Sequence, residues 1–100
     1  MIRRNTFRPI DRLDSRHLLS IILCIGESGG CRKVDIYENV SWNTNMPKKI
    51  RELKDMGIID DPQSDDDGVL RLTPFGMTIY TALKFMEESM TMHGVDAPVE

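Results

Sequence analysis

The apolar residues between positions 15 and 30 recur at the three- and four-residue spacing of an amphipathic helix. They are Leu18, Leu19, Ile22, Leu23 and Ile25. Asp14 or Ser15 offers an oxygen to cap the first turn, and Gly26, Gly29 and Gly30 end the segment. The pattern therefore predicts a core helix from Ser15 up to these glycines.

A second, shorter helix is predicted over Lys33 to Val40, which has apolar members at helical spacing. The residues that follow, Ser41 to Thr44, are rich in side chains that bond to the local backbone and predict a turn. Trp42 lies in this turn. We expect its ring to cover the crossing of the two flanking helices, and the alternative is a base-stacking role.

The third helix is predicted to begin between Asn43 and Met46. Side-chain oxygens at 43, 44 or 45 can cap its first turn, where Pro47 is tolerated because its missing N–H had no partner there. Apolar residues at 50, 53 and 56 form its inward face, and Gly57 ends it. Residues 44 to 56 thus predict an amphipathic helix with a basic outer face.

A β-hairpin is predicted after this helix. Ile58 and Ile59 begin an apolar strand, and residues 69 to 72 form a second strand that can pair with it. A loop rich in turn residues joins the two. Thr73 and Pro74 are then a cap and first-turn pair that opens the last helix.

The last helix carries an apolar stripe with spacings of four, three and four residues: Ile79, Leu83, Met86 and Met90. A helix that continues past residue 84 outreaches a domain of this size and leaves its outer methionines in water. Pairing with the same helix of a second copy would cover them. The stripe therefore predicts a homodimer interface, with a monomer as the alternative.

One hundred residues suffice for a single globular domain. We expect a basic N-terminal arm over residues 1–13, extended or a short helix, and the main domain over 14–76. The C-terminal helix should cover 77–92 and a flexible tail 93–100. The formal net charge is −3, but residues 1–59 hold 11 Lys or Arg against 7 Asp or Glu, so basic charge gathers around the third helix.

Two blocks of sequence resemble a known family. In IRELKDMGII, residues 50–59, a helix runs into a glycine and an apolar pair; in LRLTPFG, residues 70–76, a strand leads through Leu-Thr-Pro into a helix. Over residues 18–86 the chain resembles the winged helix-turn-helix transcriptional regulators, which include MarR-, ArsR- and PadR-like proteins, and especially the small archaeal regulators of this kind. The resemblance implies an α+β, mainly helical fold: a three-helix core, a β-hairpin wing and a C-terminal helix.

The resemblance also implies a sequence-specific DNA-binding transcriptional regulator, with the helix over 44–56 in the major groove of double-stranded DNA. The candidate DNA contacts are Asn43, Thr44, Asn45, Lys48, Lys49, Arg51 and Arg71. Asparagine can pair with adenine through two hydrogen bonds, and lysine can reach guanine acceptors or phosphates. The alternative for the lysines and arginine is a solvated helix face with Lys48–Glu52 and Arg51–Asp55 ion pairs.

The predicted wing departs from the family pattern. Its tip, residues 60–68, is DDPQSDDDG and holds five aspartates, which phosphates would repel. The wing therefore points away from DNA, or meets a basic protein surface, or the protein does not bind DNA. The alternative function is a protein-interaction module within a larger assembly.

No motif predicts an enzyme, a cofactor or a metal site. The chain lacks a glycine-rich phosphate loop, a serine nucleophile motif and a paired Cys/His set, and Asp65 to Asp67 lack the calcium-loop pattern. Cys24 and Cys31 are expected as reduced thiols of a cytoplasmic protein, with a redox switch as the alternative. The longest apolar run, Ile21 to Ile25, has five residues and is too short to cross a membrane.

Overall fold

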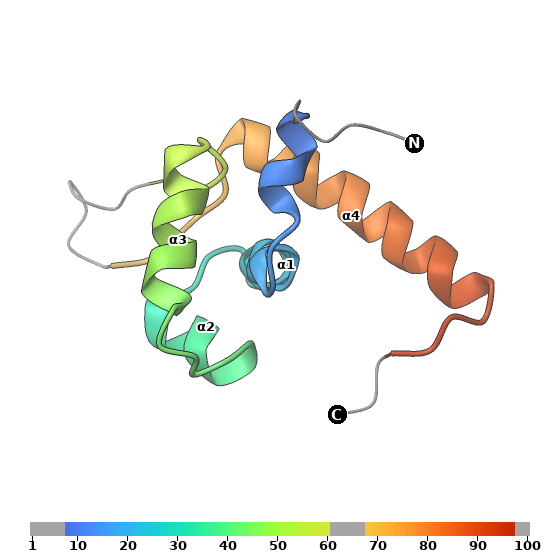
Figure 1. Ribbon diagram of the computed structural model, residues 1–100, viewed down its shortest axis with the longest axis horizontal. Helices are drawn as coiled ribbons and strands as arrows, with labels where there is room; N and C mark the ends of the chain where they lie inside the picture. Colours follow the sequence, from blue (N-terminus) through green and yellow to red (C-terminus); the bar gives the residue numbers. More distant parts are fainter. Residues whose placement is uncertain (1–7, 61–67, 98–100) are drawn as a thin grey trace, which may run out of the picture.

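The computed structural model describes residues 8–60 and 68–97 and is mainly helical within them (Figure 1). Its elements are a 3-10 helix, η1 (Pro9–Leu13), and the helices α1 (Leu18–Ser28), α2 (Lys33–Asn39), α3 (Met46–Asp55) and α4 (Pro74–Met92). The central helix is α1, which contacts α2, α3 and α4. Figure 1 shows it end-on, with α2 and α3 on one side and α4 extending away on the other.

The core is built from the apolar faces predicted for α1 and α3. In α1, Leu18, Ile22 and Ile25 are buried as expected, whereas Leu19 is exposed. Each fully buried aliphatic side chain stabilises the fold by about 1.5–3 kcal/mol relative to exposure. The residues that form the buried cluster are Leu18, Ile21, Ile22, Ile25, Cys31, Ile36, Met46, Ile50, Leu53, Ile58, Ile59 and Leu70.

The β-hairpin wing does not exist in the described residues, so the α+β winged fold class predicted from the sequence is wrong. Only two isolated antiparallel bridges occur in residues 8–60 and 68–97: Cys31 with Leu70, and Ile59 with Leu72. Leu70 exchanges both of its backbone hydrogen bonds with Cys31, while the next carbonyl, that of Arg71, accepts from the N–H of Asp60 at 2.8 Å. Each of the two pairings consists of a single bridge, so no two-stranded ladder forms in the described residues. The predicted tip, residues 61–67, lies outside the described residues.

The start of α1 also differs from the prediction. The helix begins at Leu18, three residues after Ser15, and neither Asp14 nor Ser15 caps it. The N-cap residue is His17, whose φ of 76° is left-handed and whose side chain makes no capping hydrogen bond. The predicted glycine end is confirmed, since Gly29 follows Ser28 with a φ of 73°.

The predicted start of α4 is confirmed. The Oγ1 of Thr73 accepts from the N–H of Gly76 at 2.9 Å, and Pro74 occupies the first turn. Gly76 is buried against the backbone, since an added Cβ would collide with the carbonyl oxygen of Ile58. The domain boundary expected at residue 77 falls inside α4, which runs without a break from Pro74 to Met92.

The ends of the chain are described only in part. Residues 1–7 of the expected basic arm and 98–100 of the expected tail lie outside the described residues. Residues 9–13 of the arm form η1, the short helix that was one of the two expectations. In the described part of the chain, none of the helices has the length and hydropathy needed to span a bilayer.

Candidate nucleic-acid interface

The connection between α2 and α3 is a turn held by its own polar side chains, as predicted. The Oγ of Ser41 accepts from the backbone N–H of Asn43 at 3.0 Å, and the Oδ1 of Asn43 accepts from the N–H of Asn45 at 2.8 Å. The expected side-chain cap of α3 is not formed, because Asn45 occupies the N-cap position without a capping hydrogen bond. The carboxamide of Asn45 therefore remains available at the surface, whereas that of Asn43 helps to fix the turn.

The helix α3 has one buried face and one polar face. Met46, Ile50 and Leu53 are buried in the core, while Lys48 and Arg51 are exposed on the other side. The three residues before the helix, 43 to 45, are also exposed. Residues 43 to 45 and the cations Lys48 and Arg51 are thus exposed just before α3 and along the helix itself.

The lysines of α3 differ in their surroundings. Lys49 is half-buried and its Nζ donates to the Oγ of Ser15 at 3.1 Å, which ties α3 to the segment before α1. Lys54 is half-buried near the end of the helix. Sequence reasoning missed the contact to Ser15, and no local signal could have found it across 34 residues.

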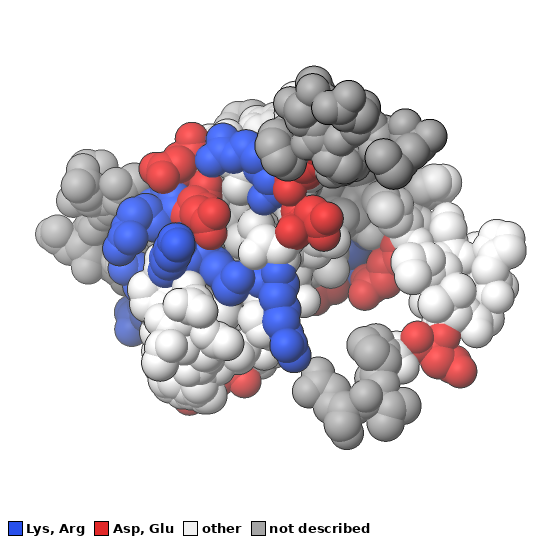
Figure 2. Space-filling model, viewed as in Figure 1, with Lys and Arg blue, Asp and Glu red and all other residues white. Residues whose placement is uncertain are grey.

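The charge of this surface is mixed, and two of its cations, Lys48 and Arg51, have no acidic partners among the described residues. Neither of the two expected pairs, Lys48 with Glu52 and Arg51 with Asp55, forms an ion pair in the described part of the chain. Figure 2 shows Lys and Arg side chains gathered over α3, with acidic side chains among them. The helix face with these two ion pairs, which was the alternative to DNA contact, is therefore not formed. The side chains of Lys48 and Arg51 can bind an anion.

Arg71 lies apart from this surface in the backbone pairing. Its carbonyl oxygen accepts from the N–H of Asp60, which follows the C-terminal end of α3. The candidate residues Asn43 to Asn45 precede the other end of the helix. The backbone pairing of Arg71 is therefore with the segment after α3, and not with the residues that precede the helix.

The ring of Trp42 was expected to be buried over the crossing of the two flanking helices, and it is not. Its side chain is 66% exposed, although it belongs to the turn between two core helices. Its ring packs instead on Tyr37, with the ring centroids 5.5 Å apart and the planes at 48°. The fully buried side chains on either side of it in the sequence are Ile36 of α2 and Met46 of α3.

The stripe predicted for the last helix divides into two parts. Ile79 and Leu83 are half-buried and pack against the chain's own core. Met86 and Met90 are 55% and 51% exposed and line a hollow of about 340 Å³ between the far half of α4 and α1. The covered part of the stripe is internal packing, and only the outer part is available for a partner.

The two cysteines come together across the glycine turn that ends α1. Both are free thiols and line a cavity of about 620 Å³ between α1 and α2. Burial raises the pKa of Cys24, and burial together with the neighbouring Cys24 raises the pKa of Cys31 to about 11. Such thiols are protonated at neutral pH, and the thiolate is the nucleophilic form, so their reactivity is low. In the described ranges no three His, Cys, Asp or Glu side chains are grouped to hold a metal ion.

Comparison of the chain with models of protein families, with curated proteins and with solved structures finds no match. The function of the surface around α3 must therefore be argued from its own geometry and charge.

Proposed function

We propose that this protein is a sequence-specific DNA-binding transcriptional regulator that places α3 in the major groove of duplex DNA. The observation that carries the proposal is an unengaged asparagine side chain, that of Asn45, which lies three residues before Lys48 and six before Arg51. All three side chains are exposed, and the two cations have no acidic partners in the described residues. Asparagine reads adenine edges, and lysine and arginine reach phosphates or guanine.

The dimensions of α3 suit this role. Its 10 residues span about 15 Å, and a single helix of this length fits lengthwise into the major groove. The residues just before α3, 43 to 45, are exposed, and in a helix-turn-helix the side chains at this end of the second helix reach base edges. The proposal does not require a wing, and the acidic residue Asp60 lies beyond the opposite end of α3.

A homodimer through the outer half of α4 belongs to the same proposal. Met86 and Met90 are the residues of the expected interface that remain exposed, and Phe85 is exposed beside them. Covering these side chains with a second copy removes apolar surface from water at about 25 cal/mol per Å². A two-fold dimer would present two α3 helices to the halves of a palindromic site.

The proposal is tested by the salt dependence of duplex binding. If Lys48 and Arg51 each neutralise one phosphate, the affinity of one chain should fall about tenfold between about 50 and about 200 mM salt. We would measure fluorescence anisotropy with a pool of labelled random duplexes, and then select the tightest binders to define the preferred bases. Affinity that does not change over this salt range, with no sequence enriched, would overturn the proposal and favour a protein-interaction module.

A further inference from the structure

Trp42 is an apolar side chain that the fold leaves in water. It is 66% exposed, immediately before the residues proposed to face the bases. Tryptophan is amphipathic, with a large apolar ring and a single N–H that only donates hydrogen bonds. An exposed tryptophan at a binding surface is a frequent energetic anchor of that surface.

The indole ring packs on a neighbouring side chain, that of Tyr37. Tyr37 of α2 packs against the hydrophobic core, and its ring lies 5.5 Å from that of Trp42, centroid to centroid. The backbone on both sides is also fixed, because the hydrogen bond from the N–H of Asn43 to the Oγ of Ser41 spans Trp42. A partner would therefore meet a side chain that is already largely ordered, which lowers the entropy lost on binding.

The position of Trp42 suits the phosphate backbone better than the bases. When the first turn of a helix reaches base edges, the segment just before it passes beside the sugar-phosphate chain. Phosphate oxygens only accept hydrogen bonds, and an indole N–H only donates. Lys48, in the first turn of α3, is exposed as well and can supply positive charge to the same phosphate backbone.

We infer that Trp42 is a positioning residue for duplex DNA, whose indole N–H donates to a backbone phosphate while its ring covers the adjoining deoxyribose. This inference rests on the proposed function of α3. The contact fixes the register of the helix on the duplex and carries no base preference of its own.

Trp42 is the only tryptophan of the chain, so tryptophan emission reports on this one position. The experiment titrates the full chain with a selected duplex of about 20 base pairs and measures quenching of the emission by acrylamide. We expect the quenching constant to fall at least about threefold on binding, because the duplex covers the indole.

Two variants accompany this measurement. Trp42→Phe keeps a ring on Tyr37 but lacks the N–H, and should bind about tenfold more weakly on all duplex sequences alike. Ile10→Ala is the matched control, because Ile10 is also 66% exposed but lies on η1, and it should bind as the wild type does. An exposed residue contributes little to folding, so both variants should melt close to the wild-type temperature.

The outcomes separate this inference from the proposed function. Salt-dependent duplex binding with unchanged acrylamide access and an unaffected Trp42→Phe variant would overturn the role of Trp42 and leave the role of α3 intact. Absence of duplex binding in the wild-type chain would overturn both. The quenching measurement uses the unaltered protein and decides the question even if Trp42→Phe fails to fold.

Discussion

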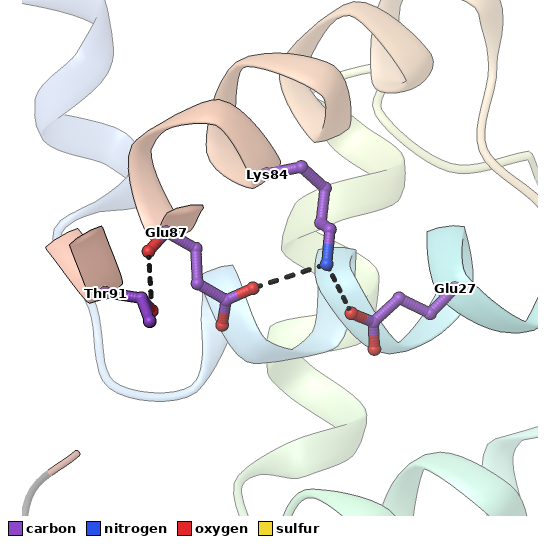
Figure 3. A network of polar contacts seen from close by, with 4 residues as sticks. All are labelled: Glu27, Lys84, Glu87 and Thr91. Carbon is purple, nitrogen blue, oxygen red and sulfur yellow. Dashed lines mark hydrogen bonds and ion pairs between the residues drawn. The ribbon is translucent and has the colours of Figure 1, made fainter. Parts of the chain in front are cut away.

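The Nζ of Lys84 on α4 lies 3.1 Å from the Oε2 of Glu27 on α1 and 3.4 Å from the Oε1 of Glu87 on its own helix (Figure 3). The hydrogen bond with Glu27 is the main cause that raises the pKa of Lys84. The contact joins residues 57 apart in the sequence, at the point where α4 passes the end of α1. It helps to set the direction in which the outer half of α4 leaves the domain.

Replacing Lys84 by Met should lower stability slightly and in a salt-dependent way. The pair is exposed, so its attraction is modest and screened by salt. Because the folded state raises the pKa of Lys84, this stabilisation is present at neutral pH and is lost as the pH rises through the folded value, above the ordinary 10.5. The contribution of the ion pair is measured as the difference in the free energy of unfolding between wild type and variant, by urea unfolding at about 50 mM and about 1 M salt.

The matched control for this variant is Glu88→Gln, a neighbouring exposed carboxylate that forms no ion pair in the described part of the chain. It should leave the unfolding midpoint unchanged at both salt concentrations. A Lys84→Met effect that is equally large at high salt would point to lost packing of the lysine stem instead.

Gly76→Ala should destabilise the protein by about 3 kcal/mol or more. The added Cβ would collide with the carbonyl oxygen of Ile58, a backbone atom that cannot move without disturbing Thr73 at the start of α4. Gly26→Ala is the comparison, because there the Cβ meets the ring of Tyr80, a side chain that can rotate. Its cost should be smaller, about 1–2 kcal/mol, in urea unfolding. Equal losses for the two variants would contradict this account.

The thiols of Cys24 and Cys31 should react slowly with a disulfide reagent at neutral pH and faster as the pH rises. Burial raises both pKa values above the ordinary 9.0, that of Cys31 to about 11. Because these pKa values are raised, the associated stability is complete below pH 9 and is lost as the pH rises towards 11. Stopped labelling at a series of pH values, with Cys24→Ser to isolate Cys31, measures the rates. Rapid labelling of Cys31 in the native protein at pH 7 would contradict the burial.

Two variants of the α3 surface should separate affinity from specificity. Lys48→Ala removes a phosphate or guanine contact and should weaken duplex binding and reduce its salt slope by about 1. Asn45→Ala should relax the preference at one base pair by roughly 1–3 kcal/mol without changing the fold, because its side chain makes no capping bond. Binding competition among selected duplexes measures both. Asn45→Ala with an unchanged base preference would exclude Asn45 as a reader.

Met86→Glu should convert the proposed dimer to a monomer. Met86 is 55% exposed, so a charge there costs little in the free chain but would be buried in a dimer. Sedimentation at micromolar concentration should show the 11.5 kDa species for the variant and twice that mass for the wild type. Ile79→Glu is the contrasting variant, which should unfold the domain because Ile79 packs on the core. A wild-type chain that sediments only at 11.5 kDa would end the dimer proposal.

The helices could be predicted closely because local signals define them. The Thr73 and Pro74 start of α4 and the positive φ of Gly57 after α3 depend on residues adjacent in sequence. The start of α1 was the exception, since His17 adopts a left-handed conformation without a side-chain cap and no pattern indicates that. Apart from Arg71 on the expected hairpin, the candidate DNA contacts were predicted at the start of one helix and along it. The exposure of Lys48 and Arg51 follows from the spacing of the buried residues of α3.

What the sequence by itself determined are the helical segments, their apolar faces and the gathering of basic residues on α3, because side chains three and four apart share a face whatever surrounds them. Only the tertiary structure decided the rest. Leu70 pairs with Cys31 and not with the segment after α3, Trp42 stays outside, and Ile79 turns inward while Met86 does not. These outcomes depend on which distant segments fill the limited space around α1. The local sequence around a residue does not indicate which segments those are.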